Sequence, residues 1–144
     1  MIQFETNQQV GPTIGAAQWR TWQRKLAAGL PKKFHGRASV AIVGDRAMQQ
    51  LNYRYRGKNR VTDVLSFSEK DVQQRIPDEN SLGEVIICYP QAVRQAKQYK
   101  TSLTKELEHL LVHGVLHLLG FDHQRPADEK KMMALQERII DSKL

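Results

Sequence analysis

Residues 106–123 read Glu106-Leu-Glu-His-Leu-Leu-Val-His113-Gly-Val-Leu-His117-Leu-Leu-Gly120-Phe-Asp-His123, and the rest of the chain is organised around them. Leucine and valine occupy nearly the whole circumference of the helix that this pattern predicts. A helix that is apolar on every side is buried in a protein core. The segment therefore predicts a central buried helix that also carries histidines.

The histidines of this segment have the spacing of a metal site. His113 and His117 are four residues apart, so an α-helix places both imidazoles on one face. Gly120 can end the helix with a positive φ, and His123 can then fold back toward the same point. Three convergent imidazoles predict a divalent-metal site with an open coordination position. The alternative is three core or surface histidines that happen to lie close together.

The same spacing occurs in the zinc motif of metzincin proteases, with one difference. Gly114 stands where that motif carries its catalytic glutamate. The missing glutamate is an argument against a peptidase.

Length, composition and charge restrict the class of protein. The 144 residues predict one domain of ordinary soluble composition, over residues 1–144, with neither a leader peptide nor a membrane span. Cys88 is the only cysteine, which excludes a disulfide framework and favours a reducing, cytoplasmic location. Residues 1–60 carry a net charge of +9 and residues 61–144 a net charge of −2. The basic half suggests nucleic acid as a partner, although simple solvation of the charges is the alternative.

Periodicity, caps and breakers divide the chain into nine predicted elements. The expected strands cover about residues 2–6, 38–43, 64–68 and 85–89, and the expected helices about residues 13–30, 45–55, 90–99, 103–119 and 126–140. The third and fourth strands have no helix between them, so at least one pair should be antiparallel. These elements predict an α+β fold, a mixed four-stranded sheet covered by about five helices. Thr13 and Asp45 are the expected helix caps, and Met48, Leu51 and Tyr55 are expected to face inward.

Three separated blocks of sequence resemble the bacterial YbeY endoribonuclease family. They are His-Gly-Val-Leu-His-Leu-Leu-Gly-Phe-Asp-His at residues 113–123, Leu-Asn-Tyr-Arg-Tyr-Arg-Gly-Lys at 51–58 followed by Thr-Asp-Val-Leu-Ser-Phe at 62–67, and Leu-Gly-Glu-Val-Ile-Ile-Cys at 82–88. The departures from the usual family residues are Asn59, Val61, Ser68 and Glu84. None of them removes a predicted metal ligand.

The resemblance implies a metal-dependent endoribonuclease that is specific for single-stranded RNA. It implies action in maturation of the 16S ribosomal RNA 3′ end and in late-stage 70S ribosome quality control. The implied partners are ribosomal RNA, the small ribosomal subunit and assembly factors. The implied cofactor is Zn²⁺ on His113, His117 and His123, with another divalent transition metal as the alternative, and Arg56 is implied to be functionally important.

Phosphodiester cleavage needs charge neutralisation at phosphorus. A zinc ion on neutral imidazoles keeps its charge and can polarise a phosphoryl oxygen or activate water. Arg56 could hold the phosphate with its planar fork, and Arg54, Lys58 and Arg60 could guide the RNA backbone. A surface cation is the alternative interpretation of Arg56.

The general base is less clear from the sequence. Glu84 and Asp122 are the available carboxylates, and Asp122 could instead orient a ligand. His109, one turn before His113, is interpreted as a supporting or core histidine. Two other functions stay open, namely a metalloprotease-like hydrolase with a displaced base and a non-enzymatic, RNA-binding ribosome-assembly factor. The second needs a structural metal with a fourth ligand, which Cys88 or His109 would supply.

Overall fold

The computed structural model describes residues 1–69, 71, 79–122 and 124–143, and within them the predicted order of elements is confirmed. The strands are β1 (Ile2–Gln8), β2 (Gly36–Val43), β3 (Val64–Ser68) and β4 (Ser81–Cys88), and the helices are α1 (Ala16–Gly29), α2 (Asp45–Arg56), α3 (Tyr89–Gln98), α4 (Leu103–Leu118) and α5 (Pro126–Ile140). The strands form one mixed sheet in the order β1-β2-β4-β3. β1, β2 and β4 are parallel, and β3 is the antiparallel edge strand beside β4.

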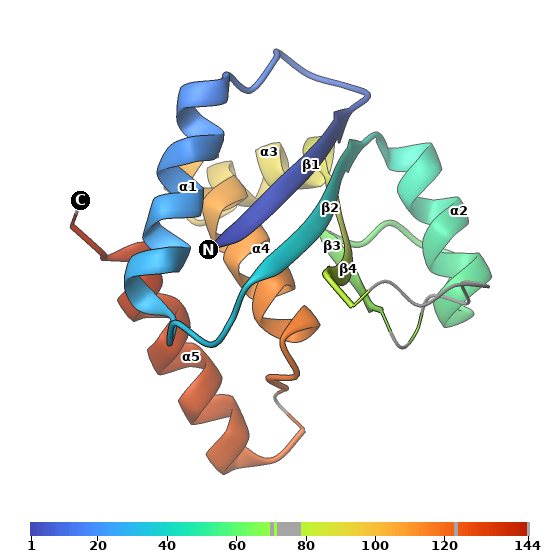
Figure 1. The fold of residues 1–144 in the computed structure, drawn as a ribbon. Helices are drawn as coiled ribbons and strands as arrows, with labels where there is room; N and C mark the ends of the chain where they lie inside the picture. The colour runs from blue at the N-terminus through green and yellow to red at the C-terminus, as the bar shows by residue number, and fades with distance from the viewer. Residues whose placement is uncertain (70, 72–78, 123, 144) are drawn as a thin grey trace.

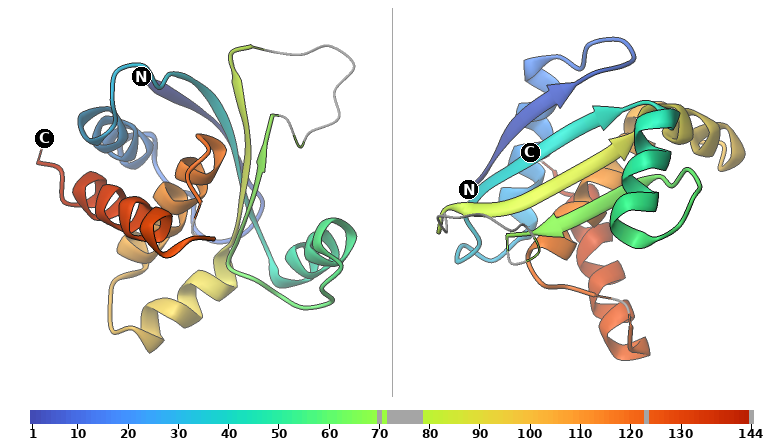
Figure 2. Two further views of the ribbon diagram at one scale, coloured as in Figure 1. Left: turned by 90° about the horizontal axis from the view of Figure 1, so that it is seen from below. Right: turned by 90° about the vertical axis from the view of Figure 1, so that its right-hand side faces the viewer.

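Helices cover the two faces of the sheet unequally (Figures 1 and 2). α1, α4 and α5 lie on one face, with α3 at the end of β4, whereas α2 lies alone on the other face. The larger core lies between the sheet and α4, where Leu111, Val115 and Leu116 are fully buried. A smaller core lies under α2, around Met48 and Cys88. The buried central helix predicted from the sequence is therefore confirmed.

Local chemistry fixes both ends of α4. Ser102 caps the first turn, and its hydroxyl oxygen accepts a hydrogen bond from the Lys105 backbone N–H at 3.1 Å. After the helix ends, Gly120 has a φ of +95°, as the predicted stop requires. The chain therefore turns back just beyond His117.

Side chains of β3 alternate between the two faces of the sheet. The Ser66 hydroxyl donates to the Gly114 carbonyl on α4 at 3.2 Å. Phe67 packs instead in the smaller core on the α2 side. β3 thus connects the two sides of the sheet at its exposed edge.

The helix caps predicted at Thr13 and Asp45 are wrong. α1 begins at Ala16, because the Gln8 side chain holds the preceding loop by donating to the Pro12 carbonyl at 2.6 Å and accepting from the Ile14 N–H at 2.8 Å. Asp45 makes no cap hydrogen bond. Its carboxylate binds the Arg94 guanidinium of α3 at 2.7 and 3.0 Å, and these bonds hold the pKa of Asp45 below its ordinary value.

Two further predictions differ from the structure. β4 begins at Ser81 rather than Val85, because the main chain around Gly83 pairs with strands on both sides despite its polar side chains. Tyr55 does not face inward, since 53% of its surface is exposed. The Tyr55 ring packs on Phe67 of the edge strand β3, at the border of the smaller core. None of the described helices is long and apolar enough to cross a membrane.

Candidate active site

Histidines form a row along one face of α4. His109, His113 and His117 are each one turn apart, and the Nε2 atoms of His113 and His117 lie 3.1 Å from each other. Their rings meet edge to face with centroids 4.6 Å apart. The two imidazoles therefore direct the same nitrogen to one point, as the sequence predicts.

Gln136 of α5 contacts two histidines of this row, His113 and His109. It is buried, with 7% of its surface exposed, and its Oε1 lies 3.0 Å from His113 Nδ1. An amide oxygen only accepts hydrogen bonds, so Nδ1 of His113 carries the proton and Nε2 carries the lone pair. The Gln136 amide nitrogen lies 3.1 and 3.2 Å from the ring nitrogens of His109. His109 thus supports His113 through Gln136.

The role of Gln136 is missing from the sequence-based site. One signal could have found it, because it is a polar residue within the apolar stripe that contains Met132 and Ile139. A glutamine buried in such a stripe needs a polar partner.

The donor set fits a transition metal. Two nitrogens that bind one tetrahedral zinc at about 2.0–2.1 Å lie roughly 3.3 Å apart. The observed separation of 3.1 Å between the His113 and His117 Nε2 atoms is close to that value. The third predicted ligand, His123, lies outside the described residues. Among the described residues alone, no group of three or more His, Cys, Asp or Glu side chains could hold a metal.

A cavity of about 590 Å³ opens beside these imidazoles. His113 and His117 line one side, and the end of α2 with the turn that follows lines the other. Its lining comprises Asn52, Arg56, Lys58, Arg60, Thr62, Asp63, Val64, Leu65, Ser66, Ser68, Asp71, His113, His117, Asp122 and Gln124. The residues on each side of position 123 are among them. The predicted basic residues and the predicted ligands therefore share one space.

The basic turn after α2 is anchored by hydrogen bonds. Gly57 ends α2 with a φ of +70°. The buried Asn52 side chain then donates to the Arg60 carbonyl at 2.9 Å, which folds the turn back onto the helix. Arg56 donates to the Ser66 carbonyl at the edge of β3 at 3.0 Å. Lys58 and Arg60 are thus held at the cavity, but Arg54 does not line it.

The structure separates the two candidate carboxylates. Asp122 lines the cavity and accepts from the Gln124 backbone N–H at 3.3 Å. Glu84 is exposed and shares its face of β4 with Ile86, on the α2 side, so it is not brought to the imidazoles. Asp63 lines the cavity without having been given a role, although it stands in one of the quoted sequence blocks. It accepts from the Gln95 side chain at 3.3 Å.

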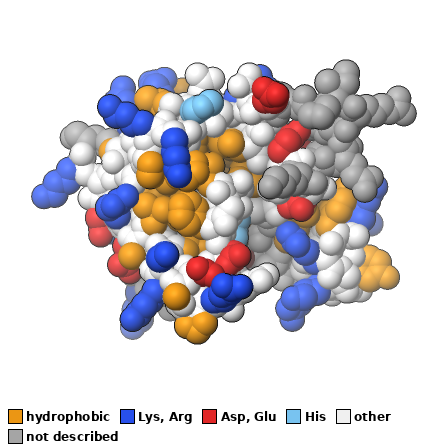
Figure 3. Space-filling model, turned by 60° about the horizontal axis from the view of Figure 1, so that its bottom comes forward, with side chains coloured by type: hydrophobic (Ala, Val, Ile, Leu, Met, Phe, Trp, Pro, Cys, Tyr) orange, Lys and Arg blue, Asp and Glu red, His pale blue; other side chains and the backbone are white. Residues whose placement is uncertain are grey.

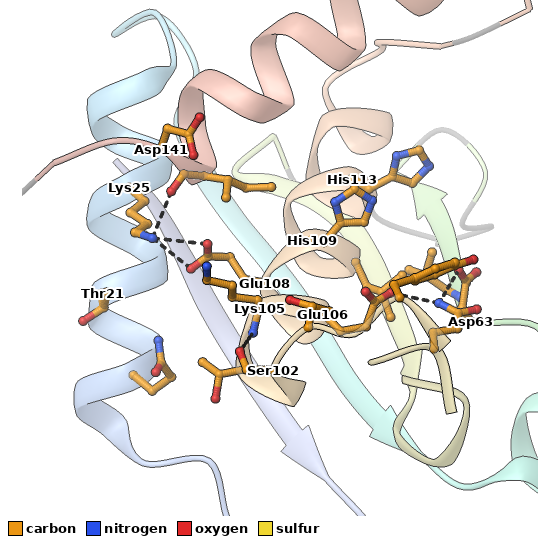
Figure 4. A pocket seen from close by; sticks show the side chains of 18 residues that line it. Thr21, Lys25, Asp63, Ser102, Lys105, Glu106, Glu108, His109, His113 and Asp141 are labelled. Atoms are coloured by element: carbon orange, nitrogen blue, oxygen red, sulfur yellow. Dashed lines mark hydrogen bonds and ion pairs between the residues drawn. The ribbon is translucent and has the colours of Figure 1, made fainter. Parts of the chain in front are cut away.

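A second cavity of about 870 Å³ adjoins the first (Figure 4). Asp63, Val64 and His113 line both. In the second cavity, Lys25 of α1 donates to the buried Glu108 carboxylate at 3.2 Å and to a carbonyl of α5 at 3.0 Å. These charges compensate each other and tie α1 to α4 and α5. The smaller cavity is lined by Arg56, Lys58 and Arg60 together with three carboxylates, those of Asp63, Asp71 and Asp122.

The charged surface is mixed on the face that Figure 3 shows. Lysine and arginine side chains surround a hydrophobic patch, and acidic side chains lie among them. Basic and acidic side chains are thus interspersed on this face, which does not present one sign of charge.

Comparison with known proteins identifies the family. The family model described as Endoribonuclease YbeY matches residues 3–143. The chain belongs to the endoribonuclease YbeY family. Membership of this family implies a hydrolase that acts on RNA.

Individual relatives agree. Endoribonuclease YbeY of Moorella thermoacetica is 42% identical over 146 residues, covering 93% of this chain and 92% of that protein. Endoribonuclease YbeY of Myxococcus xanthus is 46% identical over 102 residues, covering 71% of this chain but only 35% of that protein. The solution structure of TM1509 from Thermotoga maritima is also similar, with 28% identity, a TM-score of 0.64, and coverage of 98% of this chain and 87% of that one. The fold is thus shared across nearly the whole chain.

Proposed function

We propose that the protein is a metal-dependent endoribonuclease that cleaves single-stranded RNA in the cavity between α4 and the basic turn. One observation carries the proposal. His113 and His117 line the same cavity of about 590 Å³ as Arg56, Lys58 and Arg60. A nitrogen donor set for a metal beside cationic side chains can supply the charge stabilisation that phosphodiester cleavage needs.

The proposed metal ligands are His113, His117 and His123, and the proposed ion is zinc. The convergent Nε2 atoms and the Gln136 hydrogen bond support this assignment. When bound, the ion supplies positive charge beside the phosphate and lowers the pKa of water that it binds.

The remaining residues of the cavity act on the phosphate and the strand. A guanidinium has five N–H donors, so the bond from Arg56 to Ser66 leaves several for a phosphate. Lys58 and Arg60 contact neighbouring phosphates without reading the sequence of bases. Of the two carboxylates expected from the sequence, Asp122 is the candidate for holding a proton or orienting a ligand, because it lines the cavity while Glu84 does not.

We further propose ribosomal RNA as the biological substrate. The resemblance of the three sequence blocks supports action on the 16S ribosomal RNA 3′ end and in ribosome quality control. The small ribosomal subunit would then be the partner on which the enzyme works.

Two observations disfavour the alternative functions. A β-carbon on Gly114 would lie 2.6 Å from Val85 Cγ1, so this position has no room for the glutamate of a metalloprotease. Cys88 is fully buried on the α2 side of the sheet, and burial raises the pKa of its thiol to about 11. Cys88 therefore cannot complete a four-ligand structural site with His113 and His117.

The test is single-turnover cleavage of a labelled single-stranded RNA by the metal-loaded protein and by Arg56→Lys. The lysine keeps the charge but loses the bidentate fork. We expect cleavage to slow by about 10²-fold or more, the scale for losing one preorganised charge stabiliser. Binding should stay within a few-fold of the unmodified protein.

Arg46→Lys is the matched control, because Arg46 is an exposed arginine of the same helix that lies outside the cavity lining. Equal loss of binding and cleavage in Arg56→Lys would make Arg56 a docking residue. Absence of cleavage by the unmodified, metal-loaded protein would instead favour the non-enzymatic assembly factor.

A further inference from the structure

An exposed aromatic ring lies at the end of α2, next in the chain to Arg56 of the cavity lining. Tyr55 is 53% exposed, although the sequence pattern predicts it to be buried. Its ring packs on Phe67 with centroids 5.2 Å apart at 58°. The Arg54 guanidinium carbon lies 5.3 Å from the centroid of the Tyr55 ring. We call Tyr55, Phe67 and Arg54 the aromatic platform.

The aromatic platform is connected directly to Arg56. The guanidinium carbon of Arg56 lies 5.3 Å from the Phe67 centroid, so Arg56 and Tyr55 both contact the same ring. Arg56 also donates to the Ser66 carbonyl across the edge of β3 and lines the cavity. The platform lies outside the cavity lining, and Arg56 is the residue that connects the two.

The Tyr55 ring is held in place before any ligand binds. Phe67 is partly buried in the smaller core and supports the ring from the sheet side. Arg54 contacts the ring as well, which restricts its rotamers further. A rigid aromatic side chain loses little conformational entropy when a second ring stacks on it.

We propose that Tyr55 is a stacking site for an unpaired base of the RNA, next to the phosphate that Arg56 holds. The proposal rests on the function proposed above and adds a specificity-determining residue to that site. Nucleobases stack on exposed aromatic rings, and the flanking guanidinium groups of Arg54 and Arg56 attract the phosphates on either side. The positive charge of these two guanidinium groups thus favours a nucleic acid strand over an apolar partner.

The stacking site gives a physical reason for selecting single strands. A base in a duplex is already stacked and paired, so it reaches Tyr55 only after unpairing, which costs a few kcal/mol. Every base has a π-face, so the site tolerates all four bases. Tyr55 thereby distinguishes strandedness without reading sequence.

The experiment measures binding of short single-stranded RNAs in which one base at a time is replaced by an abasic nucleotide. Fluorescence anisotropy is recorded with metal-loaded protein at a low temperature at which no cleavage is detected. Tyr55→Ala should weaken binding of the intact RNA by between about 5-fold and 100-fold. In the unmodified protein, an abasic nucleotide at one position should weaken RNA binding by a similar factor relative to the intact RNA. We call this factor the abasic cost, and it should disappear in Tyr55→Ala.

Tyr53→Ala is the matched control. Tyr53 is 61% exposed on the same helix, but two residues place it roughly 200° around the helix from Tyr55. Tyr53→Ala should leave both binding and the abasic cost unchanged. Tyr55→Phe should keep binding, and Tyr55→Leu should lose it, while thermal unfolding checks that each variant folds.

The outcomes separate this inference from the proposed function. If the protein cleaves RNA but the abasic cost is the same with and without Tyr55, the stacking site is wrong and the endoribonuclease proposal stands. If the abasic cost depends on Tyr55 but no RNA is cleaved, Tyr55 binds RNA and the cleavage proposal fails. Failure to bind single-stranded RNA at all contradicts both.

Discussion

The hydrogen bond between Gln136 and His113 determines what the imidazole can bind. With Nδ1 committed to the Gln136 oxygen at 3.0 Å, only Nε2 of His113 carries a lone pair toward His117. The same amide contacts His109, so one buried side chain of α5 orients the row on α4. A single residue outside every recognised sequence block thus orients His113, one of the proposed ligands.

This arrangement predicts that Gln136→Leu weakens metal binding while the fold is kept. Loss of an orienting partner usually lowers metal affinity by about 10–100-fold. Competition titration with a chelator measures the affinity, and His117→Ala, which removes a proposed ligand, sets the scale for loss of bound metal. Unchanged affinity in Gln136→Leu would show that the His113 tautomer does not depend on Gln136. Full metal content in His117→Ala would contradict the ligand assignment itself.

At the scale of elements, the close approach of α4 to the sheet explains the glycine in the histidine motif. A β-carbon on Gly114 would lie 2.6 Å from Val85 Cγ1 and 3.1 Å from Ser66 Oγ. The Ser66 hydroxyl meanwhile bonds to the Gly114 carbonyl at 3.2 Å. Position 114 therefore faces the strands, and the proposed catalytic face lies elsewhere on the helix.

We expect Gly114→Ala to destabilise the protein by up to about 2 kcal/mol. The overpacking cost of about 1–3 kcal/mol is partly offset by the better helix propensity of alanine. Denaturant unfolding measures the change. In a Val85→Ala background, which removes the clashing methyl groups, Gly114→Ala should be neutral or stabilising. Additive effects of the two substitutions would show that the helix does not pack against Val85 as described.

Much of the fold was predictable because it depends on local patterns. The apolar run predicted the buried α4, and the missing helix between β3 and β4 predicted their antiparallel pairing. Tyr55 was predicted wrongly, because helical periodicity counts an aromatic ring as buried and cannot show where the sheet ends. That residues 1–144 form a single domain stays a prediction.

The site was predictable where its residues belong to contiguous motifs. His113 and His117 converge as their spacing implies, and Arg56, Lys58 and Arg60 meet them in one cavity. The contact of Gln136 with His113 depends on which face of α5 packs against α4. The position of Glu84 away from the imidazoles depends on which face of the sheet its side chain occupies. Those orientations follow from tertiary packing, which the sequence pattern does not specify.

At the scale of the whole molecule, folding brings the two halves of the charge distribution together. Residues 1–60 carry a net charge of +9, and residues 61–144 carry a net charge of −2. The basic turn belongs to the first half, whereas α4 with its histidines belongs to the second. On the face that Figure 3 shows, acidic side chains lie among basic ones and weaken the long-range field of that face. Direct phosphate contacts at the cavity should consequently dominate RNA affinity.

Salt dependence tests this conclusion. Each phosphate contact on a single strand contributes about 0.7 to the slope of log affinity against log salt concentration. Replacing both Lys58 and Arg60 with alanine should therefore lower the magnitude of that slope by about 1.4. Lys32 and Lys33 belong to the same basic half but do not line the cavity, so their double alanine variant is the matched control and should keep the slope. Equal reductions in both variants would mean that RNA responds to net charge alone. The anchored turn after α2 would then have no special part in holding the strand.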